Sequence, residues 1–220
     1  MDSQSDMKMK RVSVSIIFYL LVSVLSSYAE TSFLPVKNEK KTREEFSQKT
    51  TDVFSIKADF RQEKSISALS DKIFSSGLFL FKKSNKLRLE YLKPFPYLMV
   101  MNSSKLLIKD SKKTTRTDLK SNKVFNQVNN IMTDCVSGNA LNNKDFKTQL
   151  LENATQYKLE MTPLSNGIKD FFKVIYIFID KKDFTASKLE LHELSGDYTI
   201  IKFSNKIINS NLQDDLFKTN

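Results

Sequence analysis

The sequence predicts a mainly β (α+β) fold, in which one antiparallel sheet of about ten strands curls and two helices cover its concave face. Apolar and polar residues alternate with a period of two along most of the chain, which is typical of half-buried strands. The segments between these runs are too short for parallel crossovers, so the strands are expected to pair antiparallel. A sheet of that many strands curls rather than staying flat.

The N-terminal residues 1–29 are predicted to be a signal peptide. Basic residues in Met7–Arg11 precede an apolar centre, Val12–Leu25, which is shorter than the roughly 20 residues that a membrane-spanning helix needs. The small residues of Ser27–Ala29 fit cleavage before Glu30, and the alternative is an uncleaved N-terminal anchor. Because no cysteine stands at the cleavage site to be acylated, the mature product is expected to be a soluble periplasmic monomer.

The remaining residues, 30–220, are predicted to form a single domain, since no linker or internal repeat divides them. The formal net charge is +10, but the lysines are spread along the chain and an exported protein rarely meets nucleic acid, so no nucleic-acid partner is expected. With Cys135 and His192 as the sole cysteine and histidine, the chain has no intramolecular disulfide and no recognisable catalytic or metal motif. We therefore expect no enzymatic activity, no metal and no cofactor.

The elements follow in order along the chain. Thr31–Asn38 is interpreted as a flexible lead-in, and Lys40–Val53, polar with few breakers, predicts the first helix. Turns are predicted at Ser84-Asn85, Pro94–Pro96 and Asn102–Ser104. The predicted strands are Ser55–Glu63, Lys72–Lys82, Leu87–Tyr91, Tyr97–Met101, Lys105–Asp110, Phe146–Leu151, Tyr157–Pro163, Phe172–Asp180, Lys188–Glu193 and Tyr198–Ser204.

Residues 122–137 interrupt the strand pattern with a predicted second helix that ends at Gly138. Its apolar residues recur at helical spacing and form one stripe. The stripe consists of Val124, Val128, Ile131, Met132 and Cys135. An ordinary helix packed on a sheet is one interpretation, and a movable lid is the other.

Several short motifs, taken in their order and spacing, resemble the LolA-type periplasmic lipoprotein carrier family. The first is Ile56–Gln62, in which Phe60 and Gln62 stand two apart. The second is the hairpin Gly77–Tyr91, which is followed by a proline, and the third is the closing pair Leu216-Phe217. The resemblance extends roughly from Lys40 to Phe217, nearly all of the mature chain.

The resemblance implies an unclosed, strongly curved antiparallel β-barrel with helices as a lid over a hydrophobic cavity. It also implies a chaperone that takes acylated lipoproteins from an inner-membrane lipoprotein-releasing ABC transporter and carries them to the outer membrane, where an acceptor lipoprotein receives them. A half-barrel that binds or senses another lipid, and a packed structural or interaction protein without a cavity, are the alternatives. By the parity of the strands, the cavity-wall candidates are Ile56, Ala58, Phe60, Phe79, Phe81, Leu87, Leu89 and Tyr91.

The resemblance further implies a lid latch. In the family an arginine in a Lys-Arg-Pro-Asn turn hydrogen-bonds to the lid and holds the empty cavity shut, and the matching position here is Lys83, followed by Ser84 in place of proline. Lysine offers three donors on a flexible stem, whereas arginine offers five in a rigid fork, so a differently latched lid is expected. The alternative is that Lys82 and Lys83 are a solvated pair at the turn.

Overall fold

The computed structural model of the protein describes residues 32–118, 130, 131, 133, 134 and 139–220. Phe33–Asn220 form one compact unit, which is the part described below. The predicted signal peptide, residues 1–29, lies outside the described residues, and its cleavage stays a prediction. No helix in the described part of the chain is both long and apolar enough to cross a membrane.

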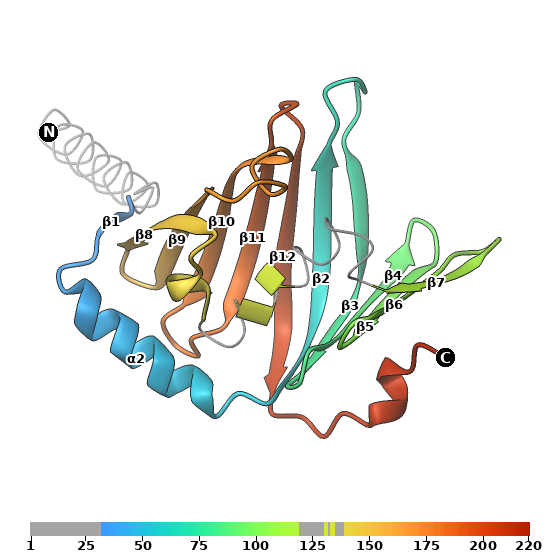
Figure 1. Cartoon of the computed structure of the whole chain (residues 1–220), viewed down its shortest axis with the longest axis horizontal. Helices are drawn as coiled ribbons and strands as arrows, with labels where there is room; N and C mark the ends of the chain where they lie inside the picture. The colour runs from blue at the N-terminus through green and yellow to red at the C-terminus, as the bar shows by residue number, and fades with distance from the viewer. Residues whose placement is uncertain (1–31, 119–129, 132, 135–138) are drawn as a thin grey trace, which may run out of the picture. The chain divides into compact units, whose positions relative to one another are not determined.

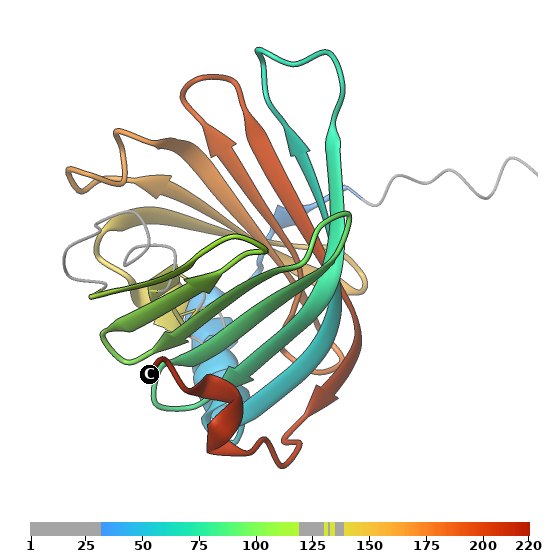
Figure 2. The same cartoon turned by 90° about the vertical axis from the view of Figure 1, so that its right-hand side faces the viewer.

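A single antiparallel sheet of 12 strands dominates this unit, and it curves strongly without closing (Figures 1 and 2). The strands lie in the order β1-β8-β9-β10-β11-β12-β2-β3-β4-β5-β6-β7, so β1 and β7 are the two edges. Their bounds are β1 Leu34–Pro35, β2 Ser55–Ser65, β3 Ile73–Lys82, β4 Lys86–Lys93, β5 Tyr97–Asn102, β6 Lys105–Lys109, β7 Thr114–Asp118, β8 Phe146–Glu152, β9 Gln156–Pro163, β10 Phe172–Asp180, β11 Ala186–Glu193 and β12 Tyr198–Ile208. The predicted curled antiparallel sheet is thereby confirmed.

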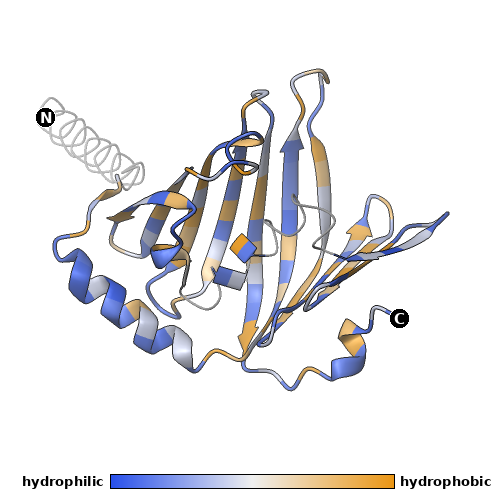
Figure 3. Ribbon diagram, in the orientation of Figure 1, coloured by the Kyte–Doolittle hydropathy of each residue, from blue (hydrophilic) through white to orange (hydrophobic). Residues whose placement is uncertain are grey.

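The alternation of side chains explains why the sheet has one apolar face. Successive residues of a strand point to opposite faces, and Figure 3 shows the resulting bands of apolar and polar residues along the strands. In β2 the side chains of Ile56, Ala58 and Phe60 are buried. Lys57, which lies between the first two, and Arg61, which follows Phe60, are exposed. The buried set packs into the main hydrophobic core on the concave, inner face.

The helix α2 (Glu39–Thr51) corresponds to the helix predicted at Lys40–Val53. It begins at Asn38, whose side-chain oxygen accepts a hydrogen bond from the Lys41 backbone N–H at 3.0 Å, as an N-cap does. Most of the helix is polar, but Phe46 is buried and packs against the rings of Tyr157 and Phe184. Phe46 is thus the buried apolar contact between this helix and the sheet.

A second, smaller hydrophobic cluster lies on the opposite, outer face and is covered by the C-terminal segment. It comprises Leu80, Val100, Leu107, Leu212 and Phe217. The segment ends in a short 3-10 helix, η4 (Asp214–Phe217), which lies against β4 and β5. Backbone carbonyls of the segment accept hydrogen bonds from Lys82, Arg88 and Asn102, so polar and apolar contacts together fix it to the sheet.

The structure differs from the sequence-based expectation at both edges of the sheet. Leu34–Pro35, interpreted as part of a flexible lead-in, form the short edge strand β1 and pair with Leu151 and Glu152. Thr114–Asp118 form the other edge strand, β7, which was not predicted because it has no apolar alternation. These two strands account for the difference between about ten expected strands and the 12 observed.

Asp214 in η4 leads to a prediction about pH. Its carboxylate accepts a hydrogen bond from Lys82 at 2.7 Å and lies 3.0 Å from Lys86 Nζ, and these ammonium groups lower its pKa to about 2. A carboxyl whose pKa is lowered by folding stabilises the protein above its unfolded pKa, and this contribution disappears as the pH falls through its folded pKa. We expect Asp214→Asn to lower the melting temperature at pH 6, with the difference from wild type vanishing as the pH falls from about 4 to about 2. A difference that stays constant over that range would contradict the ion-pair account.

Candidate ligand-binding face

The inner face of β2, β3 and β4 is built from three rows of paired residues. Ile56 pairs with Phe81, which pairs with Leu87, and the second row is Ala58, Phe79 and Leu89. The third row is Phe60, Gly77 and Tyr91. Directly paired residues point to the same face, so the structure brings all eight predicted cavity-wall side chains onto one face. Seven of the eight are buried, with at most 5% of their surface exposed, and Tyr91 is half-buried.

Gly77 in the third row is required by a close approach of backbones. A Cβ atom at this position would overlap the carbonyl oxygen of Glu90 and would lie only 2.9 Å from Tyr91 Cα. The pairing of β3 with β4 shifts register here, between Ser76 and Gly77. The missing side chain lets the two strands approach, and it leaves the rings of Phe60 and Tyr91 to pack edge to face at 4.9 Å.

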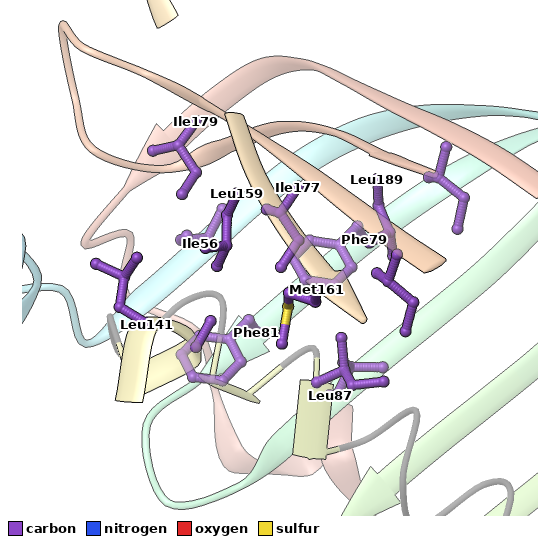
Figure 4. Close-up of a cluster of buried hydrophobic side chains, with 14 of the residues drawn as sticks. Ile56, Phe79, Phe81, Leu87, Leu141, Leu159, Met161, Ile177, Ile179 and Leu189 are labelled. Atoms are coloured by element: carbon purple, nitrogen blue, oxygen red, sulfur yellow. The ribbon is translucent and has the colours of Figure 1, made fainter. Parts of the chain in front are cut away.

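The same apolar face continues across the second half of the sheet, from which no cavity-wall residue was predicted. One row runs from Leu159 through Ile177, Leu189 and Ile201 to Gln62, crossing from β9 to β2. Figure 4 shows side chains of both halves, including Phe79, Ile177 and Leu189, gathered in one cluster. The parity argument used for β2 to β4 applies equally to these strands. What the sequence does not reveal is that β12 pairs with β2 and so joins the two halves.

One end of the inner face is aromatic, and a polar contact lies among its rings. Tyr91 packs against Phe60 and Tyr97, and its hydroxyl lies 2.9 Å from Gln62 Oε1. Burial, with a smaller contribution from Tyr97, raises the pKa of Tyr91 to about 12. The phenol therefore stays protonated at neutral pH and can donate to the amide oxygen.

Two described elements cover the inner face, and Arg43 of α2 ties them together. The 3-10 helix η3 (Asn139–Asn142) contributes Ala140 and Leu141 to the inner core, and α2 contributes Phe46. The Arg43 guanidinium donates to the backbone carbonyl of Leu141 and, at 3.3 Å, to Thr148 Oγ1. It is also held by Glu39 one turn earlier, at 2.6 Å. The role of Arg43 could not be predicted from the sequence, because no local pattern distinguishes it from the other charged residues of a polar helix.

The predicted latch residue, Lys83, also contacts α2. Its ammonium donates to the carbonyl oxygen of Thr51 at the C-terminal end of the helix, at 2.8 Å, and its backbone N–H donates to Phe54 O. Its neighbour Lys82 points the other way, to Leu212 O and Asp214 on the outer face. The two lysines are thus tied to different segments and are not a merely solvated turn pair. The role of Lys83 as a latch stays a prediction.

Most of the predicted lid stripe falls outside the part of the chain that the structure describes. Val124, Val128, Met132 and Cys135 lie outside the described residues, and their role as a lid stays a prediction. Ile131 is described, is helical and belongs to the inner core with 2% of its surface exposed. Close to it in sequence, Asp134 accepts a hydrogen bond from Asn143 Nδ2 at 2.6 Å, and burial raises its pKa.

The chemistry available at this face is the burial of apolar groups. Among the described residues, no group of three or more His, Cys, Asp or Glu side chains is arranged to hold a metal ion. His192 lies on the outer face, 3.2 Å from Glu190 and between the rings of Tyr176 and Tyr198, away from the inner core. The inner face offers rings, branched aliphatic side chains and methionines, which suit an alkyl chain and carry no directional recognition.

Comparison with known structures relates the fold to several proteins at low sequence identity. An uncharacterized conserved protein from Thermus thermophilus aligns with a TM-score of 0.50 and 11% identity, over 82% of this chain and 93% of that one. A LolA superfamily protein from Nitrosomonas europaea aligns with a TM-score of 0.41 and 12% identity, over 80% of this chain and 97% of that one. A comparison with curated protein sequences finds no significant match.

The sequence itself matches a protein family over most of its length. The match covers residues 45–220, which include every strand from β2 to β12 and the C-terminal segment on the outer face. The family is described as "Outer membrane lipoprotein carrier protein LolA". The matched length agrees with the family resemblance of the individual motifs and with the unclosed antiparallel sheet. The chain belongs to the LolA family of outer membrane lipoprotein carrier proteins.

Proposed function

We propose that this protein is a periplasmic carrier that binds the acyl chains of lipoproteins released from the inner membrane and shuttles them to the outer membrane. One observation carries the proposal: a continuous apolar face lines the concave side of an unclosed sheet in a chain of the LolA family. The partners that follow from it are acylated lipoproteins, an inner-membrane lipoprotein-releasing transporter and an outer-membrane acceptor.

The energetics of acyl chains favour such a carrier. Each buried methylene is worth about 0.8 kcal/mol, so moving one long acyl chain through water costs on the order of 10 kcal/mol. A protein that buries the chain removes this cost without any covalent chemistry. Side chains such as Phe81, Leu87 and Leu89, supplied by neighbouring strands, present the required apolar surface.

The side chains of the inner face bury one another, and this affects the affinity for a ligand. Because side chains such as Ile56 and Phe79 are already hidden from water, an acyl chain has to displace part of the covering elements before it gains contacts. The cost of that displacement is subtracted from the gain of burial, so retention is weaker than the apolar area alone suggests. A carrier that must hand over its ligand needs this moderate retention.

The first prediction concerns the ligand-binding face and has a matched control on the outer face. Leu89 and Leu107 are both buried, 5% and 7% exposed, but Leu107 belongs to the outer cluster. A buried amide without a partner costs roughly 1–3 kcal/mol, so Leu89→Gln and Leu107→Gln should both lower the melting temperature. Only Leu89→Gln should also weaken the binding of a fluorescent fatty acid, by roughly tenfold.

Thermal melting and a fluorescence titration on each purified variant decide the matter. Equal fatty-acid affinities in the two variants and the wild type would contradict the assignment of the inner face. A wild type that binds no fatty acid at all would contradict the proposed function and would favour a packed core.

The second prediction concerns the opening of the cover. Arg43→Gln removes the guanidinium that ties α2 to Leu141 and Thr148, and Lys83→Leu removes the donor to Thr51. A hydrogen bond from a charged group is worth about 1.5–3 kcal/mol when it is not exposed, so we expect fatty-acid uptake to become roughly tenfold faster in Arg43→Gln and less so in Lys83→Leu. Lys83→Arg should keep the wild-type rate or slow it, because a forked donor reaches the same carbonyl.

Stopped-flow fluorescence measures these rates, and Lys49→Gln, which changes an exposed lysine of the same helix, is the control. If Arg43→Gln takes up fatty acid no faster than Lys49→Gln, the tie between α2 and η3 does not limit entry.

A further inference from the structure

Three cations on the outer face lie in one row, and in the part of the chain that the structure describes none of them is in direct contact with a carboxylate. Lys202 of β12 pairs directly with Arg61 of β2, Arg61 pairs with Ser76 of β3, and Ser76 pairs with Lys93 of β4. Paired residues share a face, and all three cations are exposed. Within the described ranges none of the three makes an ion pair or a side-chain hydrogen bond, whereas Arg88 and Lys188 of neighbouring strands are each paired with a glutamate, at 2.8 and 2.7 Å.

This arrangement has an energetic cost that the fold does not require. Like charges placed directly opposite each other on neighbouring strands are destabilising, and Lys202 and Arg61 are so placed. Two acids stand on the neighbouring rows. The charge of Lys202 helps to lower the pKa of Glu63, but Glu63 accepts its hydrogen bonds from Lys72 and Tyr198, and Asp59 accepts one from Asn205. An external anion would remove the repulsion.

The row borders a hollow of suitable size and chemistry. Arg61, Ser75, Ser76 and Lys93 line a pocket of about 730 Å³, together with Gln62, Phe74 and Pro94. Strands lie about 4.8 Å apart, so Arg61 and Lys93 start about 10 Å from each other, and their long side chains can converge on a group held above Ser76. Two cations and the Ser76 hydroxyl, which share the outer face, form a donor set that matches a phosphate group.

Exposed apolar side chains surround this pocket at the same end of the sheet. Phe74 is 64% exposed, Leu92 53% and Phe95 79%, and the latter two flank Lys93 and Pro94. Because the strands are antiparallel, the β9–β10 and β11–β12 connections lie at this end as well, as Figure 2 shows for the upper hairpins, and they add the exposed Leu164, Phe171 and Leu194. Large apolar side chains exposed beside unpaired cations are typical of surfaces that bind anionic membranes.

We propose that this end of the sheet docks on an anionic membrane surface, with a phospholipid headgroup phosphate bound between Arg61 and Lys93 and with Phe74, Leu92 and Phe95 inserted below it. The inference goes beyond the proposed function, because docking does not depend on whether the inner face binds acyl chains. In this proposal the protein itself contacts the membrane, through its outer face and the loops at this end of the sheet.

The test is the flotation of residues 30–220, the predicted mature protein, with lipid vesicles at low salt. Wild type should float with vesicles of phosphatidylglycerol and phosphatidylcholine and not with pure phosphatidylcholine. Arg61→Gln/Lys93→Gln should weaken the partition by on the order of 30-fold, since each basic residue near an anionic surface strengthens binding by roughly fivefold. Phe95→Ser, at an exposed position, should also reduce flotation while leaving the melting temperature unchanged.

The matched control is Lys57→Gln/Lys105→Gln, which removes the same charge from exposed positions at the opposite end of the sheet. If this control loses as much binding as Arg61→Gln/Lys93→Gln, only the net charge matters and the proposed site is wrong. Binding of inorganic phosphate without flotation would show a soluble anion site and overturn the membrane assignment. Equal flotation with both vesicle types would overturn the headgroup site.

Fatty-acid binding measured on the same proteins keeps the two proposals apart. A wild type that binds fatty acid but does not float refutes docking alone. A wild type that floats but binds no fatty acid refutes the carrier function alone.

Discussion

The pairing of β12 with β2 is the contact on which the rest of the structure depends. Without it the chain would form two separate antiparallel sheets, one from β2 to β7 and one that joins β1 to the strands from β8 to β12. The pairing extends from Tyr198, which pairs with Ser65, to Ile208, which pairs with Ile56. It has one register shift, between Ser204 and Ile207. Because register fixes which side chains share a face, this contact aligns the apolar residues of both halves into one inner surface.

A continuous inner face brings a conflict between stability and function. The same side chains that would contact a ligand form the core that stabilises the empty protein, so the cover has to be docked firmly enough to fold and weakly enough to move. α2 meets this requirement: it is mostly polar, it buries Phe46 and Thr50, and its further ties include the hydrogen bonds of Arg43 and Lys83. On the outer face, in contrast, the C-terminal segment covers the small cluster around Leu80 and Val100 through both apolar packing and ion pairs, which suits a part that stays in place.

Local sequence patterns predict most of the strands and which of their side chains share a face. They do not predict the contacts between segments that are distant in the sequence. The alternation around Phe60, Phe79 and Leu89 predicts β2, β3 and β4 and the face they share, because side-chain direction in a strand follows from position alone. The strand β7 could not be found, since Thr114–Asp118 contain no apolar residue, and β1 is too short to show a period. The union of β12 with β2 joins residues more than a hundred positions apart, and no local signal specifies it. In the candidate site, likewise, Leu159 and Ile177 join the predicted wall only once the halves are paired, and the role of Arg43 depends on Leu141 far along the chain.

The central claim is that the inner face holds acyl chains, and native mass spectrometry of the protein purified from its own periplasm tests it most directly. The account predicts bound mass that corresponds to an acylated protein, and the loss of that mass in Leu89→Gln but not in Leu107→Gln. A bound lipid that is not attached to a protein would identify a carrier or sensor of a different ligand. A wild-type protein that is consistently free of bound acyl groups, purified under conditions in which a known acyl-binding protein keeps its ligand, would contradict the claim.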